Sequence, residues 1–251
     1  HLAEARLVFH LACLGVRHSV HSPYENHEII ASATLRLLAA SREQEVPRIV
    51  YVSSSEVYGT ARLVPMTEQH PTFPHTVYGA SKLAGECYTR AYHDTYEYPT
   101  VVVRPFNTYG PYQRSVGEGG VVAIFTRRSL LGDELRIYGD GTQTRDLLYA
   151  TDCARFVCDA LLSDAAIGQI LNAGTGTDVS VNDLAAAIEP DPSRIVRVEH
   201  IHPQSEIAVL RCDPRLAADL LGWQPQVSLA EGLARTRAWM ADRLEAGVPV
   251  A

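Results

Sequence analysis

The segment Arg48-Ile-Val-Tyr-Val-Ser-Ser-Ser-Glu-Val-Tyr-Gly59 decides the fold that this sequence predicts. It begins with a continuous run of β-branched and aromatic residues, which is typical of a strand buried on both faces of a parallel sheet. Three serines follow the run, and serine favours turns. We therefore expect a buried strand whose carboxyl end carries a polar loop.

Further strands and helices alternate around this segment. Apolar runs predict strands at residues 7–12 and 100–104, and helical apolar spacing predicts helices at 28–42 and about 77–93. This alternation predicts an α/β fold with a Rossmann-like, doubly wound parallel sheet. In such sheets, ligands bind in the crevice outside the carboxyl ends of the strands.

The pattern changes after about Asn107, where glycine-rich turns become frequent. Helices are expected there over about 213–221 and 229–244, with short strands before them. We therefore assign residues 1–107 to the sheet domain. Residues 108–251 are interpreted as a smaller α/β lobe that covers the carboxyl edge of the sheet and can return one or two segments to it.

Composition excludes several classes of protein. The 251 residues include 22 Lys and Arg against 29 Asp and Glu, so the net charge of −7 argues against binding to nucleic acid or anionic membranes. No apolar run approaches the roughly 18 residues of a membrane span. The five cysteines form no Cys-x-x-Cys pair, which favours free thiols in a reducing compartment and no metal site.

Tyr78 and Lys82 form a Tyr-x-x-x-Lys step on an expected helix. Residues four apart project from the same face of a helix. A lysine ammonium beside a tyrosine favours the phenolate and should lower its pKa from about 10 towards neutrality, where a general base works best. The Tyr-x-x-x-Lys spacing also arises by chance on exposed helix faces. It indicates a catalytic site only together with the serine loop and the other motifs around it.

Ordered motifs along nearly the whole chain resemble the extended short-chain dehydrogenase/reductases, and within them the NAD-dependent nucleotide-sugar epimerase/dehydratase family. The resemblance implies an NAD-binding domain in residues 1–107 and a nucleotide-sugar-binding lobe in residues 108–251. The motifs that carry it are Val8-Phe-His-Leu-Ala12, 53–59, 78–82, 104–111, 139–146 and Leu220-Leu-Gly-Trp-Gln-Pro225.

The resemblance also implies roles for individual residues. Ser54 corresponds to the hydroxyl that contacts the 4-OH of the sugar, Tyr78 to the base and Lys82 to the group that holds the nicotinamide ribose, and Glu56 joins them as a catalytic candidate. The expected NAD contacts are Leu11, Ala12, Ser53, Tyr78, Lys82 and Pro105. The expected substrate contacts are Ser55, Asn107, Arg114, Val122, Tyr138, Arg145 and Arg211.

The sequence departs from the family in three places. No Gly-x-x-Gly-x-x-Gly fingerprint occurs before Lys82, so we expect a preceding segment of roughly 60 residues, or about two βαβ steps, that is not in this sequence. Ile30 stands where the family usually has Asn, and Pro203-Gln-Ser-Glu206 stands where many members have Arg-x-Gly-Asp. Arg211 is the candidate that would replace the lost diphosphate contact.

Several chemistries remain open within the family. All begin by oxidising C4 of the sugar, and a 4-epimerase acting on a UDP-hexose or UDP-uronate is the leading interpretation. Glu56 also resembles residues of 4,6-dehydratases and UDP-glucuronate decarboxylases, although it could simply cap its loop. A non-catalytic nucleotide-sugar or NAD-binding protein is the alternative of another class. The resemblance further implies a cytoplasmic homodimer with no nucleic-acid or membrane partner.

Overall fold

A four-stranded parallel sheet is the centre of the structure, a computed structural model that describes residues 2–117, 119–200, 206–248 and 250. The strands run in the order β1, β2, β3, β8, and every neighbouring pair is parallel. Val101, Val102 and Val103 are all buried, as a strand covered on both faces requires. The strands are β1 (Val8–His10), β2 (Ile49–Val52), β3 (Thr100–Pro105) and β8 (Ile170–Ala173).

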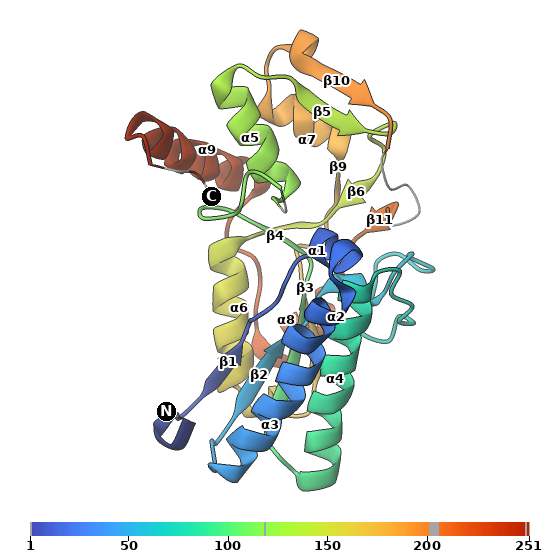
Figure 1. The fold of residues 1–251 in the computed structure, drawn as a ribbon, viewed down its shortest axis with the longest axis vertical. Coiled ribbons are helices and arrows are strands. Elements are labelled where there is room, and N and C mark those ends of the chain that lie inside the picture. The colour runs from blue at the N-terminus through green and yellow to red at the C-terminus, as the bar shows by residue number, and fades with distance from the viewer. Residues whose placement is uncertain (1, 118, 201–205, 249, 251) are drawn as a thin grey trace.

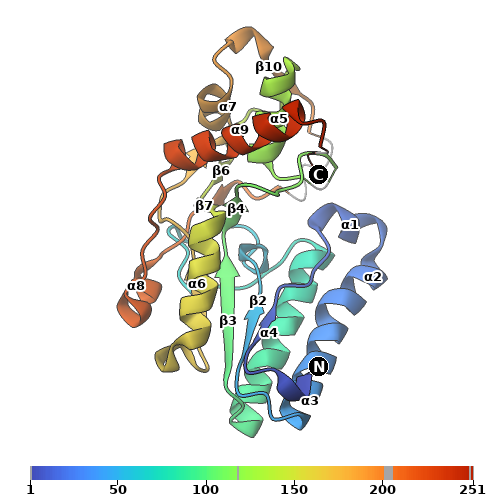
Figure 2. The same cartoon turned by 90° about the vertical axis from the view of Figure 1, so that its left-hand side faces the viewer.

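Helices cover both faces of this sheet (Figure 2). One face carries α2 (Pro23–His27), α3 (Ala33–Glu43) and α4 (Val77–Tyr96), and the other carries α6 (Ala150–Leu162) and α8 (Arg215–Leu221). The expected α/β fold with a doubly wound parallel sheet is therefore confirmed. The remaining short helices of this part are η1 (Leu2–Glu4), α1 (Val16–His21), the π-helix η2 (Glu28–Ser32), η3 (Ser55–Val57) and η4 (Asp164–Ala166).

A second group of elements lies beyond the carboxyl ends of the strands (Figure 1). Its core contains Phe125, Leu135, Ile137 and Leu184. β5 and β10 pair in parallel, as do β4 and β7, and β6 lies between β9 and β11. The elements are β4 (Asn107–Tyr109), α5 (Val121–Leu131), β5 (Leu135–Tyr138), β6 (Thr144–Arg145), β7 (Leu147–Tyr149), β9 (Val179–Ser180), α7 (Val181–Ile188), η5 (Pro192–Arg194), β10 (Ile195–Val198), β11 (Val209–Leu210) and α9 (Leu229–Glu245).

Some element boundaries differ from the sequence-based expectation. β1 ends at His10, which places Leu11 and Ala12 in the loop that follows. The helical path before α3 starts earlier than expected, because Pro23 occupies the first turn of α2. α8 starts only at Arg215, since Pro214 caps it. Among the described residues, no helix is long and apolar enough to cross a membrane.

Asp152 ties the first turn of α6 to the chain that enters α9. Its side chain is buried, and Oδ2 accepts hydrogen bonds from the backbone N–H groups of Gln226 and Val227, both at 2.9 Å. Arg155 donates to Oδ1 at 3.0 Å. One carboxylate therefore fixes the path of the chain between the sheet and the second group of elements.

We predict that Asp152→Ala lowers the free energy of unfolding by about 1–3 kcal/mol, because two backbone donors lose their acceptor. The midpoint of thermal unfolding should fall by about 3–10 °C in a chain of this length. The control is Asp159→Ala, which removes a carboxylate 3.9 Å from the same Arg155. It should change stability by less than about 0.5 kcal/mol, and equal losses in the two variants would contradict the role of Asp152.

Candidate functional site

A cavity of about 480 Å³ lies at the carboxyl edge of the sheet, and we call it the Tyr78 cavity. The loops after β1, β2 and β3 all reach it, because parallel strands end at the same edge. Its lining includes Cys13, Val16, Arg17, Ser54, Ser55, Glu56, Tyr78, Pro105, Asn107, Gln113 and Arg114.

Ser54 is held by the turn that follows β2. It precedes η3, and its hydroxyl oxygen accepts a hydrogen bond from the backbone N–H of Glu56 at 3.2 Å. The same hydroxyl acts to lower the pKa of Tyr78, and both side chains line the Tyr78 cavity. The structure therefore brings together two of the side chains that the sequence analysis named as catalytic.

Tyr78 is placed by the first turn of α4. Thr76 caps this helix, its side chain accepting from the backbone N–H of Gly79 at 3.1 Å. A Cβ atom at Gly79 would lie 2.9 Å from the carbonyl oxygen of Glu56, so the Ser54 loop packs directly on the helix backbone. The absence of a side chain at Gly79 lets Tyr78 approach Ser54.

Lys82 lies one turn further along α4 and is buried. Its Nζ donates to the carbonyl oxygen of Val52 at 2.8 Å and lies 5.9 Å from the centre of the Tyr78 ring. Burial lowers the pKa of Lys82 and raises the pKa of Tyr78, although the Ser54 hydroxyl acts to lower the pKa of Tyr78. The expected depression of the Tyr78 pKa is therefore not found, because burial of the phenol and the nearby Cys13 and Glu56 all raise it and outweigh the Ser54 hydroxyl.

A second cavity of about 380 Å³ continues from the first, and we call it the Tyr138 cavity. The two cavities share Arg17, Glu56 and Asn107, so together they form an elongated crevice. Tyr138 lies at its wall, with its ring centre 6.1 Å from that of His200. Such a crevice suits a long ligand with one end beside Tyr78 and the other beside Tyr138.

Arg145 contributes a positive charge to the Tyr138 cavity. Its guanidinium donates to the carbonyl oxygen of Ile207 at 2.7 Å and forms an ion pair with Glu206. His200 lies 2.8 Å from the other oxygen of Glu206. The sequence analysis named neither His200 nor Glu206 as a site residue. They flank residues 201–205, which include Pro203 and lie outside the described residues.

The backbone beside Arg145 is fixed by its neighbour Asp146. This buried carboxylate accepts hydrogen bonds from the backbone N–H groups of Thr175, Gly176 and Cys212 at 2.8, 2.9 and 3.1 Å. Burial raises the pKa of Asp146, and these three donors oppose the rise. Asp146 therefore joins β6, the loop after β8 and the chain after β11.

Glu56 lies where the two cavities meet, with its side chain half-buried. Burial raises the pKa of Glu56, the positive charge of Arg145 opposes that rise, and the negative charge of Glu206 adds to it. The carboxyl group therefore faces the ligand crevice, and its backbone also forms part of the Ser54 turn.

Some of the expected NAD contacts are buried or line the Tyr78 cavity, whereas others are exposed away from it. Ser53 is buried, and its hydroxyl has no hydrogen-bond partner within the described residues. Pro105 lines the Tyr78 cavity, whereas Leu11 is 54% exposed and does not. Ala12 is exposed beside it, whereas Cys13 and Gly15 of the same loop line the cavity. Ile30, at the family's usual Asn position, is fully buried.

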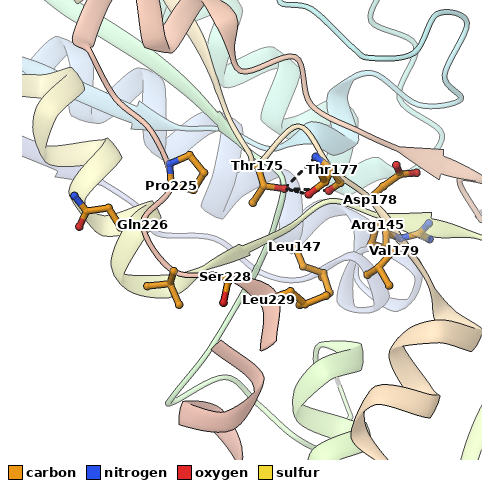
Figure 3. Close-up of a pocket in the computed structure, with 11 residues that line it drawn as sticks. Arg145, Leu147, Thr175, Thr177, Asp178, Val179, Pro225, Gln226, Ser228 and Leu229 are labelled. Carbon is orange, nitrogen blue, oxygen red and sulfur yellow. Dashed lines mark hydrogen bonds between the residues drawn. The ribbon is translucent and has the colours of Figure 1, made fainter. Parts of the chain in front are cut away.

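Two expected substrate contacts, Val122 and Arg211, do not line the crevice. Val122 is 1% exposed and packs in the core with Tyr109 and Phe125, because the helical turn of α5 directs Val121 and not Val122 to the Tyr138 cavity. Arg211 lies 3.8 Å from Asp178, which lines a third cavity of about 460 Å³ that shares Arg145 with the Tyr138 cavity (Figure 3). Neither side chain lines the crevice.

The sequence analysis missed Arg17, Gln113, His200 and Glu206 as residues of the crevice. Arg17 donates to the carbonyl oxygen of Gly117 at 2.6 Å, and it therefore joins α1 to the loop before α5. The Gln113 Nε2 donates to the carbonyl oxygen of Thr108 at 2.8 Å. The Arg17 contact links parts of the chain that are 100 residues apart, and no local spacing in the sequence signals it.

We predict that Glu56→Gln raises the midpoint of thermal unfolding, and by more at pH 8 than at pH 4. Because burial raises the pKa of Glu56, ionising it in the folded protein costs free energy that a neutral Gln does not cost. At low pH, where the Glu56 side chain is neutral like that of Gln, the variant and the wild-type protein should unfold at nearly the same temperature. The difference between their midpoints should grow as the pH rises through the raised pKa of Glu56. At the higher pH we expect about 2–4 °C, the shift that roughly 1 kcal/mol produces in a chain of this length.

The matched control is Glu134→Gln, because Glu134 is exposed on the segment before β5. Because it removes only an exposed charge, it should change stability by less than about 0.5 kcal/mol. A Glu56→Gln gain that shrinks as pH rises would show that Glu56 is stabilised as a carboxylate.

Comparison with known proteins places the chain in a family. Residues 2–236 match the family model described as GDP-mannose 4,6 dehydratase. A UDP-glucose 4-epimerase from Mycolicibacterium smegmatis is 38% identical over 243 residues, which cover 94% of this chain and 76% of the relative.

Solved structures agree with this assignment. A UDP-glucose 4-epimerase from Thermotoga maritima, solved with UDP-glucose, superposes with a TM-score of 0.90 at 32% identity and covers 95% of this chain and 78% of that one. A dTDP-glucose 4,6-dehydratase from Streptomyces venezuelae, solved with NAD bound, gives 0.89 at 29% identity, with 100% and 79% covered. The chain therefore belongs to the GDP-mannose 4,6 dehydratase family, whose members include nucleotide-sugar epimerases and dehydratases.

Proposed function

We propose that this protein is an NAD-dependent nucleotide-sugar 4-epimerase that acts on a UDP-hexose or a UDP-uronate through a transient 4-keto sugar. The grouping of Ser54 and Tyr78 at the wall of the Tyr78 cavity, with the buried Lys82 one helical turn from Tyr78, carries the proposal. The identity of 38% to a UDP-glucose 4-epimerase supports the choice of reaction. The intact set of these three side chains argues against a purely binding role.

The residues at the carboxyl edge fit NAD. Ser53 offers a buried hydroxyl without a partner among the described residues, and Lys82 offers an ammonium at the end of β2. Both would hold the cofactor, together with the chain around Pro105. When bound, NAD supplies the site that accepts and returns the C4 hydride.

The side chains of this protein would move the proton and fix the substrate. Tyr78 would take the proton of the 4-OH group and return it, and Ser54 would orient that hydroxyl. For Tyr78 to work near neutral pH, its pKa must fall, and the Ser54 hydroxyl and the Lys82 ammonium are the groups able to lower it. Asn107 and Arg145 would bind the diphosphate, because the amide and the guanidinium both donate hydrogen bonds.

A 4,6-dehydratase is the second candidate, and Glu56 is the observation that favours it. Its carboxyl group faces the crevice next to Ser54, and burial raises its pKa towards the range of a general acid or base. Such a group could remove the C5 proton from a 4-keto sugar. Decarboxylation of a UDP-uronate is a weaker candidate, because Pro203–Glu206 does not match the Arg-Lys-Pro stretch expected of such enzymes.

We further propose that residues 1–107 form the main part of the NAD-binding domain and residues 108–251 most of the nucleotide-sugar lobe, with β8 completing the sheet. The family resemblance supports a homodimer, which light scattering of the purified protein would test.

Five free cysteines support a reducing compartment such as the cytoplasm.

We predict that Tyr78→Phe lowers turnover by about 10²–10⁴-fold, because the ring remains but the base is lost. Binding of the nucleotide sugar, measured by calorimetry, should change little. Tyr96→Phe on the same helix is the control, because Tyr96 is exposed at the far end of α4 and should leave turnover unchanged. Retention of more than about a tenth of turnover in Tyr78→Phe would show that another group is the base.

The two candidate reactions differ at C5 of the sugar. In deuterated water, an epimerase should give a product inverted at C4 that carries no deuterium at C5, as read by NMR on UDP-glucose and UDP-glucuronate. A dehydratase should incorporate deuterium at C5, and its Glu56→Gln variant should accumulate reduced cofactor after C4 oxidation. Deuterium at C5 in the wild-type product would replace the epimerase proposal by the dehydratase.

A further inference from the structure

Arg104 is a buried cation that does not line the crevice. It lies near the carboxyl end of β3 and is 3% exposed. Its Nε donates to Oε1 of Glu86 at 2.9 Å and its Nη2 to Oε2 at 2.6 Å. Glu86 is 1% exposed on α4. The pair is therefore bidentate, which fixes the orientation of both planar groups.

The remaining terminal nitrogen of Arg104 reaches the Ser54 loop. Nη1 donates to the hydroxyl oxygen of Tyr58 at 2.9 Å, and this hydroxyl donates to Oδ1 of Asn172 on β8 at 2.6 Å. Tyr58 is fully buried and lies four residues after Ser54. One guanidinium group therefore contacts both the helix that carries Tyr78 and the loop that carries Ser54.

Glu86 extends the row of side chains that carries the proposed catalytic groups. Tyr78, Lys82 and Glu86 are spaced by four residues, and such residues form one ridge along a helix. The middle of the ridge is held independently, because the Tyr51 hydroxyl donates to the carbonyl oxygen of Lys82 at 3.2 Å. A rotation or shift of α4 that moved Tyr78 would also have to break the pair between Glu86 and Arg104.

A buried ion pair is not in general required for the stability of a fold. Removing two charges from water is costly, and well-packed apolar side chains of similar volume often replace a buried pair without loss of stability. What apolar side chains cannot reproduce is the fixed direction of the hydrogen bonds to Glu86 and Tyr58. The pair therefore contributes geometry beyond its contribution to packing.

We propose that Arg104 is a positioning residue, which acts through Glu86 and Tyr58 to hold Tyr78 and Ser54 at the separation that proton transfer requires. This inference rests on the proposed function, in which Tyr78 is the base. A misplacement of about 1 Å caused by a mutation away from the chemistry can cost about 10²-fold in rate.

The test compares the wild-type enzyme with a double variant, Arg104→Met with Glu86→Leu, and with Tyr58→Phe. We expect the double variant to unfold at a similar temperature but to lose about 10²-fold in kcat, with little change in KM. Its kinetic isotope effect for substrate deuterated at C4 should increase, because hydride transfer becomes slower than product release. Tyr58→Phe removes one hydroxyl group, and we expect a smaller loss of kcat with the same change in isotope effect.

A structural readout makes the test independent of turnover. In crystals of the double variant, the distance between the hydroxyl oxygens of Ser54 and Tyr78 should differ from that in crystals of the wild-type protein. An unchanged distance together with unchanged kcat would overturn the inference. If the double variant does not fold, an unchanged kcat and isotope effect in Tyr58→Phe would overturn it instead.

Parallel assays of Tyr78→Phe separate the inference from the proposed function. Full activity in Tyr78→Phe would contradict the proposed function, whatever the double variant does. Loss of activity in Tyr78→Phe with full activity in a folded double variant would contradict the positioning role alone.

Discussion

The close approach of α4 to the sheet is the constraint on which the rest of the site depends. At Gly85, a Cβ atom would lie 2.3 Å from the hydroxyl oxygen of Tyr51, so the helix can lie at this distance only because the position has no side chain. At that distance, Lys82 reaches the carbonyl group of Val52 at the end of β2. Glu86 reaches Arg104 on the next strand for the same reason. A bulkier residue at position 85 would separate all of these contacts together.

Local patterns in the sequence were sufficient for the main features of the fold. The apolar runs around residues 50 and 102 predicted buried parallel strands, because a strand covered on both faces needs apolar side chains on both. The four-residue spacing of Tyr78 and Lys82 placed both on one face of a helix. Leu11 and Ala12 were assigned to the first strand, but the chain leaves the sheet after His10.

The features that the sequence did not reveal depend on packing between distant segments. Val122 and its neighbour Val121 are chemically alike, and only the contact of α5 with its core decides which faces the crevice. The pKa of Tyr78 depends on how deeply the phenol is buried, which the spacing to Lys82 does not report. Arg211 was expected in the crevice, but its side chain lies 3.8 Å from Asp178 and does not line the crevice.

The hydrogen bonds of Asp146, which hold the backbone next to Arg145, have a consequence for how the crevice can change during evolution. Asp146 anchors the backbone at this point through three N–H groups, and none of these bonds involves Glu206. Glu206 instead contacts the guanidinium from the side of the crevice. A substitution at position 206 can therefore alter the charge offered to a ligand while the backbone that carries Arg145 stays in place. Descendants of this chain can acquire a different ligand preference through that position without first rebuilding the fold.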